Sequence, residues 1–151
     1  MPRLRLKLAI IAALGSSLSC GSTVAQILPP APRAAHVAIS QGPTLEMALD
    51  NFAIVRWTTN NPGGSNEHFG VVNYGTDPSA LSQVARSPIR LNQGHPETMF
   101  RVRVGGLQPQ TTYYYTVTSV GSDGTSDGVS SPVNQFTTPS PGQRVVKYPQ
   151  P

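Results

Sequence analysis

The stretch L-Q-P-Q-T-T-Y-Y-Y-T-V, residues 107–117, places three tyrosines in a row directly after a turn at Pro109. Neighbouring side chains of a β-strand point to opposite faces of the sheet. Tyr113 and Tyr115 can therefore share one face only if Tyr114 lies on the other. We predict that the first and third tyrosines point into a core and that the second points to solvent.

Two other segments show the same two-residue alternation. In A-I-V-R-W-T-T, Trp57 lies on the side assigned to the core and Arg56 on the other. In M-F-R-V-R-V, Arg101 and Arg103 lie opposite an apolar row, as in a sheet with one wet face. If the two strands pair, the three arginines share one outer face. That face is either a small basic contact patch or a solvated surface whose charge prevents aggregation.

Turn-forming residues such as Gly, Pro, Asn and Asp recur about every ten residues, and the segments between them are rich in β-branched and aromatic side chains. This pattern predicts an all-β fold, a seven-stranded immunoglobulin-like sandwich. The segment T-L-E-M-A-L-D, 44–50, has a helical composition and is expected to form one helical turn or a loop. The seven strands are expected near 36–40, 53–59, 69–74, 81–85, 99–104, 111–119 and 133–138.

Trp57 followed by Leu107-x-Pro109-x-Thr111-x-Tyr113 resembles the fibronectin type III family. These residues are the ones that define the fold in that family. The resemblance implies a tyrosine corner, in which the ring of Tyr113 packs inward and its hydroxyl bonds the backbone near the turn.

A more specific resemblance is carried by V-V-N-Y-G-T-D-P-S-A-L, 71–81, and N-Q-F-T-T-P, 134–139. These segments are similar to the N-terminal fibronectin-like domain of purple acid phosphatases. The resemblance covers residues 36–139. The phosphatase metal motifs, such as Asp-x-His, are absent from this sequence, so no catalytic residue is assigned.

The first residues have the pattern of a secretory signal peptide, 1–25, with a basic start, a short apolar run and small residues. We expect cleavage after Ala25 and export to the periplasm or the exterior. The alternative is a lipoprotein anchored at Cys20, the single cysteine. The apolar run is shorter than the roughly 20 residues of a transmembrane helix.

Three of the 11 Lys and Arg and none of the 7 acids lie in this leader, so eight cations against seven acids leave +1 on the mature chain. A near-neutral chain lacks the basic stripe typical of nucleic-acid binding. Proline-rich segments flank the domain at 26–35 and 140–151 and are interpreted as a linker and a tail.

The sequence shows no constellation for catalysis, and no cofactor or metal site is predicted. His36, His68 and His95 are scattered and are interpreted as surface residues. Asp123 and Asp127 lie in G-S-D-G-T-S-D-G, 121–128, which is interpreted as turn chemistry rather than a Ca²⁺ loop.

The remaining candidates for a functional site are the outer faces of the two sheets. The arginine face is one candidate contact surface, and the outer face of the opposite sheet is the other, because tyrosine suits partner contacts. We therefore expect a non-catalytic module for contact with a protein or an envelope polysaccharide, or for spacing. The alternative is an accessory domain or fragment of a purple acid phosphatase-like metallophosphoesterase. The predicted outward residues of the second sheet are Val71, Asn73, Tyr114, Thr116, Val133 and Gln135.

Overall fold

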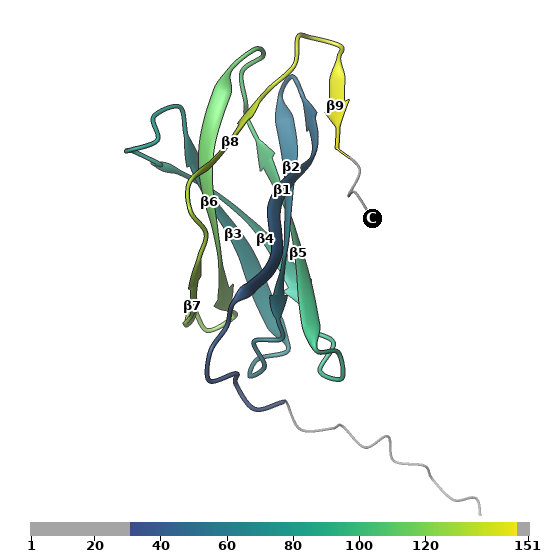
Figure 1. The fold of residues 1–151 in the computed structure, drawn as a ribbon, viewed down its shortest axis with the longest axis vertical. Helices are drawn as coiled ribbons and strands as arrows, with labels where there is room; N and C mark the ends of the chain where they lie inside the picture. The colour runs from purple at the N-terminus through teal and green to yellow at the C-terminus, as the bar shows by residue number, and fades with distance from the viewer. Residues whose placement is uncertain (1–30, 148–151) are drawn as a thin grey trace, which may run out of the picture.

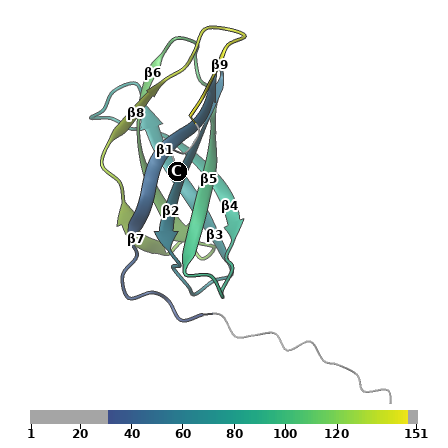
Figure 2. The same cartoon turned by 45° about the vertical axis from the view of Figure 1, so that its right-hand side comes forward.

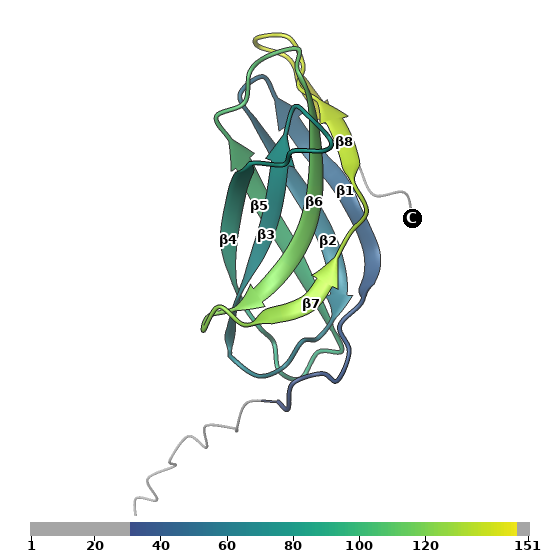
Figure 3. The same cartoon turned by 90° about the vertical axis from the view of Figure 1, so that its left-hand side faces the viewer.

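The computed structural model describes residues 31–147, which form two antiparallel sheets packed face to face, with no helix among them (Figure 1). Figure 2 turns the side that carries β9 and β5 toward the viewer, and Figure 3 shows β4, β3, β6 and β7 in front of the other sheet. The predicted all-β sandwich architecture is confirmed. This part of the chain contains no helix that is long and apolar enough to cross a membrane. The predicted signal peptide and Cys20 lie outside the described residues.

The first sheet has the strand order β5-β2-β1-β9, and the second has the order β4-β3-β6-β7, with β8 also pairing with β6. The strands of the first sheet are β1 (Ile39–Leu49), β2 (Phe52–Asn60), β5 (Glu97–Gly105) and β9 (Arg144–Val146). Those of the second are β3 (Glu67–Gly75), β4 (Gln83–Arg90), β6 (Thr112–Gly121), β7 (Ser126–Ser130) and β8 (Asn134–Thr137).

The core lies between the sheets and is centred on Trp57, which is 1% exposed and stacks on Phe100 with ring centroids 5.2 Å apart. Gly70 of β3 faces this ring. A Cβ at that position would lie 3.0 Å from Cη2 of Trp57 and 2.9 Å from Cγ2 of Val102. Because Gly70 has no side chain, the indole ring of Trp57 fits against β3. The predicted inward direction of Trp57 and of the apolar row of β5 is confirmed.

The tyrosine run has the faces that its alternation predicts. Tyr113 and Tyr115 are buried, and both belong to the core cluster, whereas Tyr114 is half-buried on the other side of β6. The backbone nitrogen of Gln108 donates a hydrogen bond of 3.0 Å to the hydroxyl of Tyr113. The tyrosine corner implied by the family resemblance is therefore present. Leu107 and Tyr113, at the two ends of the turn, are both buried in the core cluster.

The segment 44–50 does not form the expected helical turn or loop, because residues 44–49 are the second half of β1. Its backbone pairs with β2, and a register shift between Leu45 and Met47 lets both Leu45 and Ala48 face the core. Burial of these two side chains and pairing with a neighbouring strand outweigh a weak helical propensity.

The structure contains nine strands in residues 31–147, where seven were expected. One additional strand is β7, which follows a turn closed by a hydrogen bond from Gly124 N to Gly121 O. The other is β9, which lies in the segment predicted to be a tail and pairs with 47–49 of β1.

Residues 31–38, which precede β1, have no regular secondary structure but are bound to the loops beneath the sandwich. Ala34 N donates to Pro62 O, Gly64 N donates to Ala31 O, and Ala31 N donates to the side-chain carbonyl of Gln93. Residues 31–34, which belong to the predicted linker, are thus attached to the domain.

Candidate functional site

The outer face of the first sheet carries the predicted arginines side by side. Arg56 of β2 lies directly opposite Arg101 of β5, and Ile54 lies opposite Arg103. All three arginine side chains point away from the core, because the residues between them along each strand are buried. The structure thus brings these three predicted residues together, and their contact role stays a prediction.

Two of these arginines are held in place by neighbours. The guanidinium of Arg101 donates through Nε and Nη2 to the two carboxylate oxygens of Glu46, with Nε 2.9 Å from Oε2. These hydrogen bonds and the charge of Glu46 raise the pKa of Arg101 above its usual value. The guanidinium carbon of Arg103 lies 4.2 Å from the ring centroid of Phe52, which is a cation–π contact.

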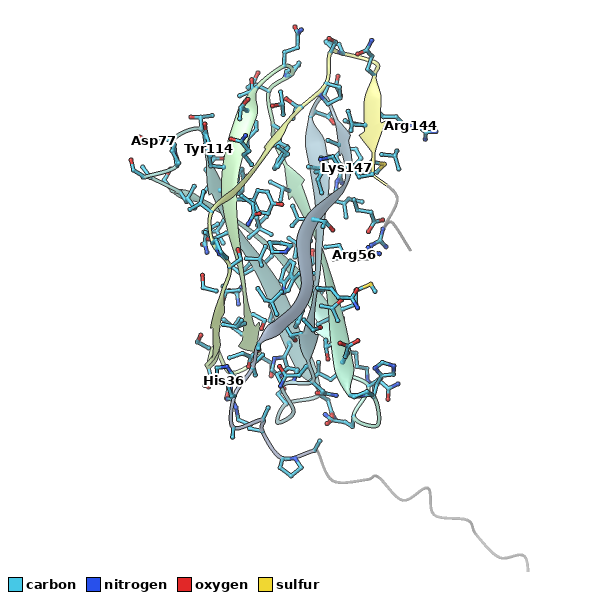
Figure 4. All side chains as sticks on the ribbon, in the orientation of Figure 1. His36, Arg56, Asp77, Tyr114, Arg144 and Lys147 are labelled. Atoms are coloured by element: carbon cyan, nitrogen blue, oxygen red, sulfur yellow. The ribbon has the colours of Figure 1, made fainter. Side chains whose placement is uncertain are left out.

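Strand β9 and the residue that follows it bring two further cations to this sheet, Arg144 and Lys147. Arg144 pairs with Leu49, and Lys147 N donates to Glu46 O. Figure 4 shows Arg56, Arg144 and Lys147 on the same side of the molecule, away from Tyr114 and Asp77. Sequence reasoning missed both, because residues 140–151 were interpreted as a tail. We call the following five residues the cationic face: Arg56, Arg101, Arg103, Arg144 and Lys147.

The outer face of the second sheet is less open than predicted. Val71 points outward from β3 but is only 7% exposed, because β3 is an interior strand and Arg86 and Thr118 flank Val71 on the adjacent strands. Its proposed role as a contact residue is corrected on that ground. Asn73 and Tyr114 are half-buried on the same face. Thr116 is half-buried there too, while Val133 and Gln135 are exposed.

The interpretation of His68 as a surface residue is wrong, because it is 1% exposed. Its Nδ1 lies 3.0 Å from Oδ2 of Asp127, and its Nε2 lies 3.1 Å from the carbonyl oxygen of Gly63. Ser119 Oγ donates to the same Asp127 oxygen over 2.7 Å, and Arg33 Nη2 donates to Oδ1 over 3.2 Å. Asp127 is thus a buried acceptor and not a turn residue of the 121–128 loop.

This buried cluster has the residue types of a catalytic triad but not the connections of one. The two ring nitrogens of His68 lie against Asp127 Oδ2 and the carbonyl oxygen of Gly63. Neither of them contacts Ser119, whose hydroxyl donates to Asp127 instead. The cluster therefore ties β3, β6, β7 and the segment around Arg33 together. No signal in the sequence links His68 to a partner 59 residues away.

The other predicted surface and turn residues lie where the sequence placed them. His36 and His95 are exposed. Asp123 is exposed and accepts the backbone N–H of Thr125, and this bond lowers the pKa of the Asp123 carboxyl. Across residues 31–147, no three His, Cys, Asp or Glu side chains gather in a way that could hold a metal ion.

A groove of about 450 Å³ opens between the first half of β1 and β7, at the side of the sandwich. Its walls include His36, Pro43, Val129 and Pro132. His36 is the one ionisable side chain among the residues that line it, so the groove offers little chemistry.

Residues 32–138 match the family model described as the purple acid phosphatase N-terminal domain. The chain belongs to this family. The match ends just after β8, before β9, and contains the tyrosine corner and the core tryptophan. The predicted membership, and with it the fibronectin-like fold of this purple acid phosphatase N-terminal domain, is therefore confirmed.

Solved structures to which the chain is similar include the short form of the sensor domain of the anti-sigma factor RsgI4 from Pseudobacteroides cellulosolvens. It is 21% identical, the match covers 70% of this chain and 94% of that one, and the TM-score is 0.45. The third fibronectin III domain of the human KIAA0343 protein is 18% identical over 87% of this chain and 97% of that one, with a TM-score of 0.34. No curated protein matches the chain.

Proposed function

We propose that this domain is an exported, non-catalytic β-sandwich that makes contacts at the bacterial envelope, with a protein or a polysaccharide as partner. The observation that carries the proposal is the division of its polar side chains. Those with the chemistry of a catalyst, His68, Asp127 and Ser119, are buried and bonded to each other. The residues of the cationic face lie on the outside of a sheet and are exposed, except for Arg56, which is half-buried.

Family membership supports a non-catalytic role, because the match is to the N-terminal domain of the phosphatases and not to their catalytic part. A phosphoesterase needs a metal to polarise the phosphoryl oxygen and to activate water. The alternative role as an accessory domain of such an enzyme requires a catalytic partner, and no described residue of this chain favours it over a contact role.

The proposal is tested with residues 26–151 and with cell envelopes isolated from the producing bacterium. The protein should sediment with the envelopes at physiological ionic strength. Protease treatment of the envelopes should abolish sedimentation if the partner is a protein, and periodate oxidation should abolish it if the partner is a polysaccharide. Protein that stays in the supernatant at both low and physiological salt would rule out the contact function.

A further inference from the structure

Positive charge is concentrated on one side of this domain. Residues 31–147 contain eight Lys and Arg, and five of them form the cationic face. Glu46 is the acid among them, and it is engaged with Arg101. The nearest other acids along these strands are Asp50, in the turn at one end of the sheet, and Glu97, at the other end, where it accepts the hydroxyl of Ser40. The centre of the face is therefore cationic while the mature chain is nearly neutral.

The arrangement carries a cost that a merely solvated face would avoid. Like charges directly opposite each other on neighbouring strands are destabilising, and Arg56 faces Arg101 in this way. Glu46 bonds Arg101 and leaves Arg56 without an ion-pair partner in residues 31–147. Such an alignment is useful when a negatively charged ligand lies across both strands.

Two of the guanidinium groups are held in place by neighbouring side chains before any ligand binds. Arg101 is fixed by Glu46, and Arg103 is stacked on Phe52 with no hydrogen bond to any described residue, so its donors point to solvent. Side chains that are already ordered lose less conformational entropy on binding. The forked donors of arginine match carboxylate and phosphate oxygens.

The spacing of the charges suits an extended ligand. Neighbouring strands lie about 4.8 Å apart, so the order β5-β2-β1-β9 spreads the cations over a width of about 14 Å. A single small anion would contact only part of this width. A chain that carries repeated negative charges could contact several strands at once.

We propose that the cationic face binds an acidic polysaccharide of the envelope, a glycan chain bearing repeated carboxylate or phosphate groups. This rests on the contact function proposed above and names its partner and its surface. Binding is electrostatic, so it weakens as salt is added. Arg56 and Arg103 are its central contacts, with Arg144 and Lys147 extending the surface along β9.

The test uses polygalacturonate as the acidic probe, dextran as the neutral one, and phosphatidylglycerol vesicles as an anionic surface without sugar. The test variant is Arg56→Gln/Arg103→Gln. The control is Arg86→Gln/Arg90→Gln, which removes the same charge from the opposite sheet. The control is matched in packing as well, because Arg86 lies over Phe69 as Arg103 lies over Phe52. Urea unfolding midpoints establish that both variants are folded.

We expect the wild type to bind polygalacturonate and not dextran. The test variant should bind about fivefold more weakly, with a shallower salt dependence, and the control should stay within about twofold of the wild type. Equal losses in both variants, equal binding to dextran, or binding to the vesicles alone would overturn the inference. If the test variant still sediments with envelopes like the wild type, the contact function stands and this surface is not responsible. If the wild type does not sediment at all, the contact function itself fails.

Discussion

The hydroxyl of Tyr113 lies 3.0 Å from the backbone nitrogen of Gln108, which donates a hydrogen bond to it. This bond joins the first residues of β6 to the turn that precedes them. The neighbouring ring of Tyr114 makes no such bond to the described residues and lies on the opposite side of the strand. The two adjacent tyrosines therefore have different roles, one in the fold and one at the surface.

Tyr113→Phe removes the acceptor and leaves the Gln108 N–H unpaired. We expect a loss of about 1 to 3 kcal/mol in the free energy of unfolding, measured by urea titration. Tyr114→Ala is the control, and it should change stability by about half a kcal/mol or less. A larger loss for Tyr114→Ala than for Tyr113→Phe would contradict the assigned faces.

His68→Phe keeps a ring of similar size but removes both hydrogen-bonding ring nitrogens. The carbonyl of Gly63 then lacks its side-chain partner, and the buried Asp127 carboxylate loses one of its three partners. Leaving these buried polar partners unsatisfied is expected to lower the free energy of unfolding by about 1 to 3 kcal/mol. His36→Phe, at an exposed position, should cost about half a kcal/mol or less. Similar urea midpoints for the two variants would show that the cluster does not stabilise the fold.

Tyr115 makes the free energy of unfolding depend on pH in the alkaline range. Burial raises the pKa of Tyr115 to about 12, against 10.0 for an unperturbed tyrosine. Below pH 10 the phenol is protonated in both the folded and the unfolded states, so it has no effect on the pH dependence. Between pH 10 and 12 the unfolded state releases the proton and the folded state retains it, so stability falls as pH rises.

The loss in the free energy of unfolding follows from the pKa shift of Tyr115 and is on the order of 2 to 3 kcal/mol by pH 12. It is measured as the difference between the wild type and Tyr115→Phe in urea titrations at pH 9 and pH 11.5. The comparison within one pH removes contributions from other groups, including Tyr74, whose pKa burial also raises. A wild type and a variant that lose stability in parallel would rule out this source.

Purified residues 26–151 should not hydrolyse phosphomonoesters when Fe, Zn or Mn is added, since the described residues form no cluster that could bind the metal and activate water. Release of p-nitrophenol from p-nitrophenyl phosphate is the measurement. Metal-dependent turnover that comigrates with the protein in gel filtration, and that is lost in His68→Phe or in His95→Gln, would contradict this.

Much of the fold could be predicted because alternation is a local signal. The faces of Trp57, Tyr113 and Arg101 follow from their immediate neighbours and from the two-residue period of a strand. The second half of β1 was missed because Leu, Glu, Met and Ala favour a helix in isolation, and only pairing with β2 reverses that preference. Strand β7 was missed because Ser-Asp-Gly-Val-Ser has the composition of a turn.

The polar sites were harder to predict because they depend on contacts between distant segments. His68 and Asp127 meet because β3 pairs with β6 and β6 pairs with β7, which no local pattern of either residue indicates. In the same way, the membership of Arg144 in the cationic face depends on β9 pairing with β1. The arginines of β2 and β5 were predicted because the alternation of apolar and polar residues within each strand identifies its outward-facing side chains.

The attachment of residues 31–34 to the loops beneath the sandwich also has a mechanical consequence. Ala31 and Ala34 are bonded to the loops around Gln93 and Pro62, and Arg33 is bonded to the carboxylate of Asp127. A force applied to the domain through the chain that precedes it must first load these bonds and the buried cluster behind them, before it reaches β1. Mechanical load that enters at Ala31 is therefore shared between the loops and the buried cluster, so β1 does not carry it alone.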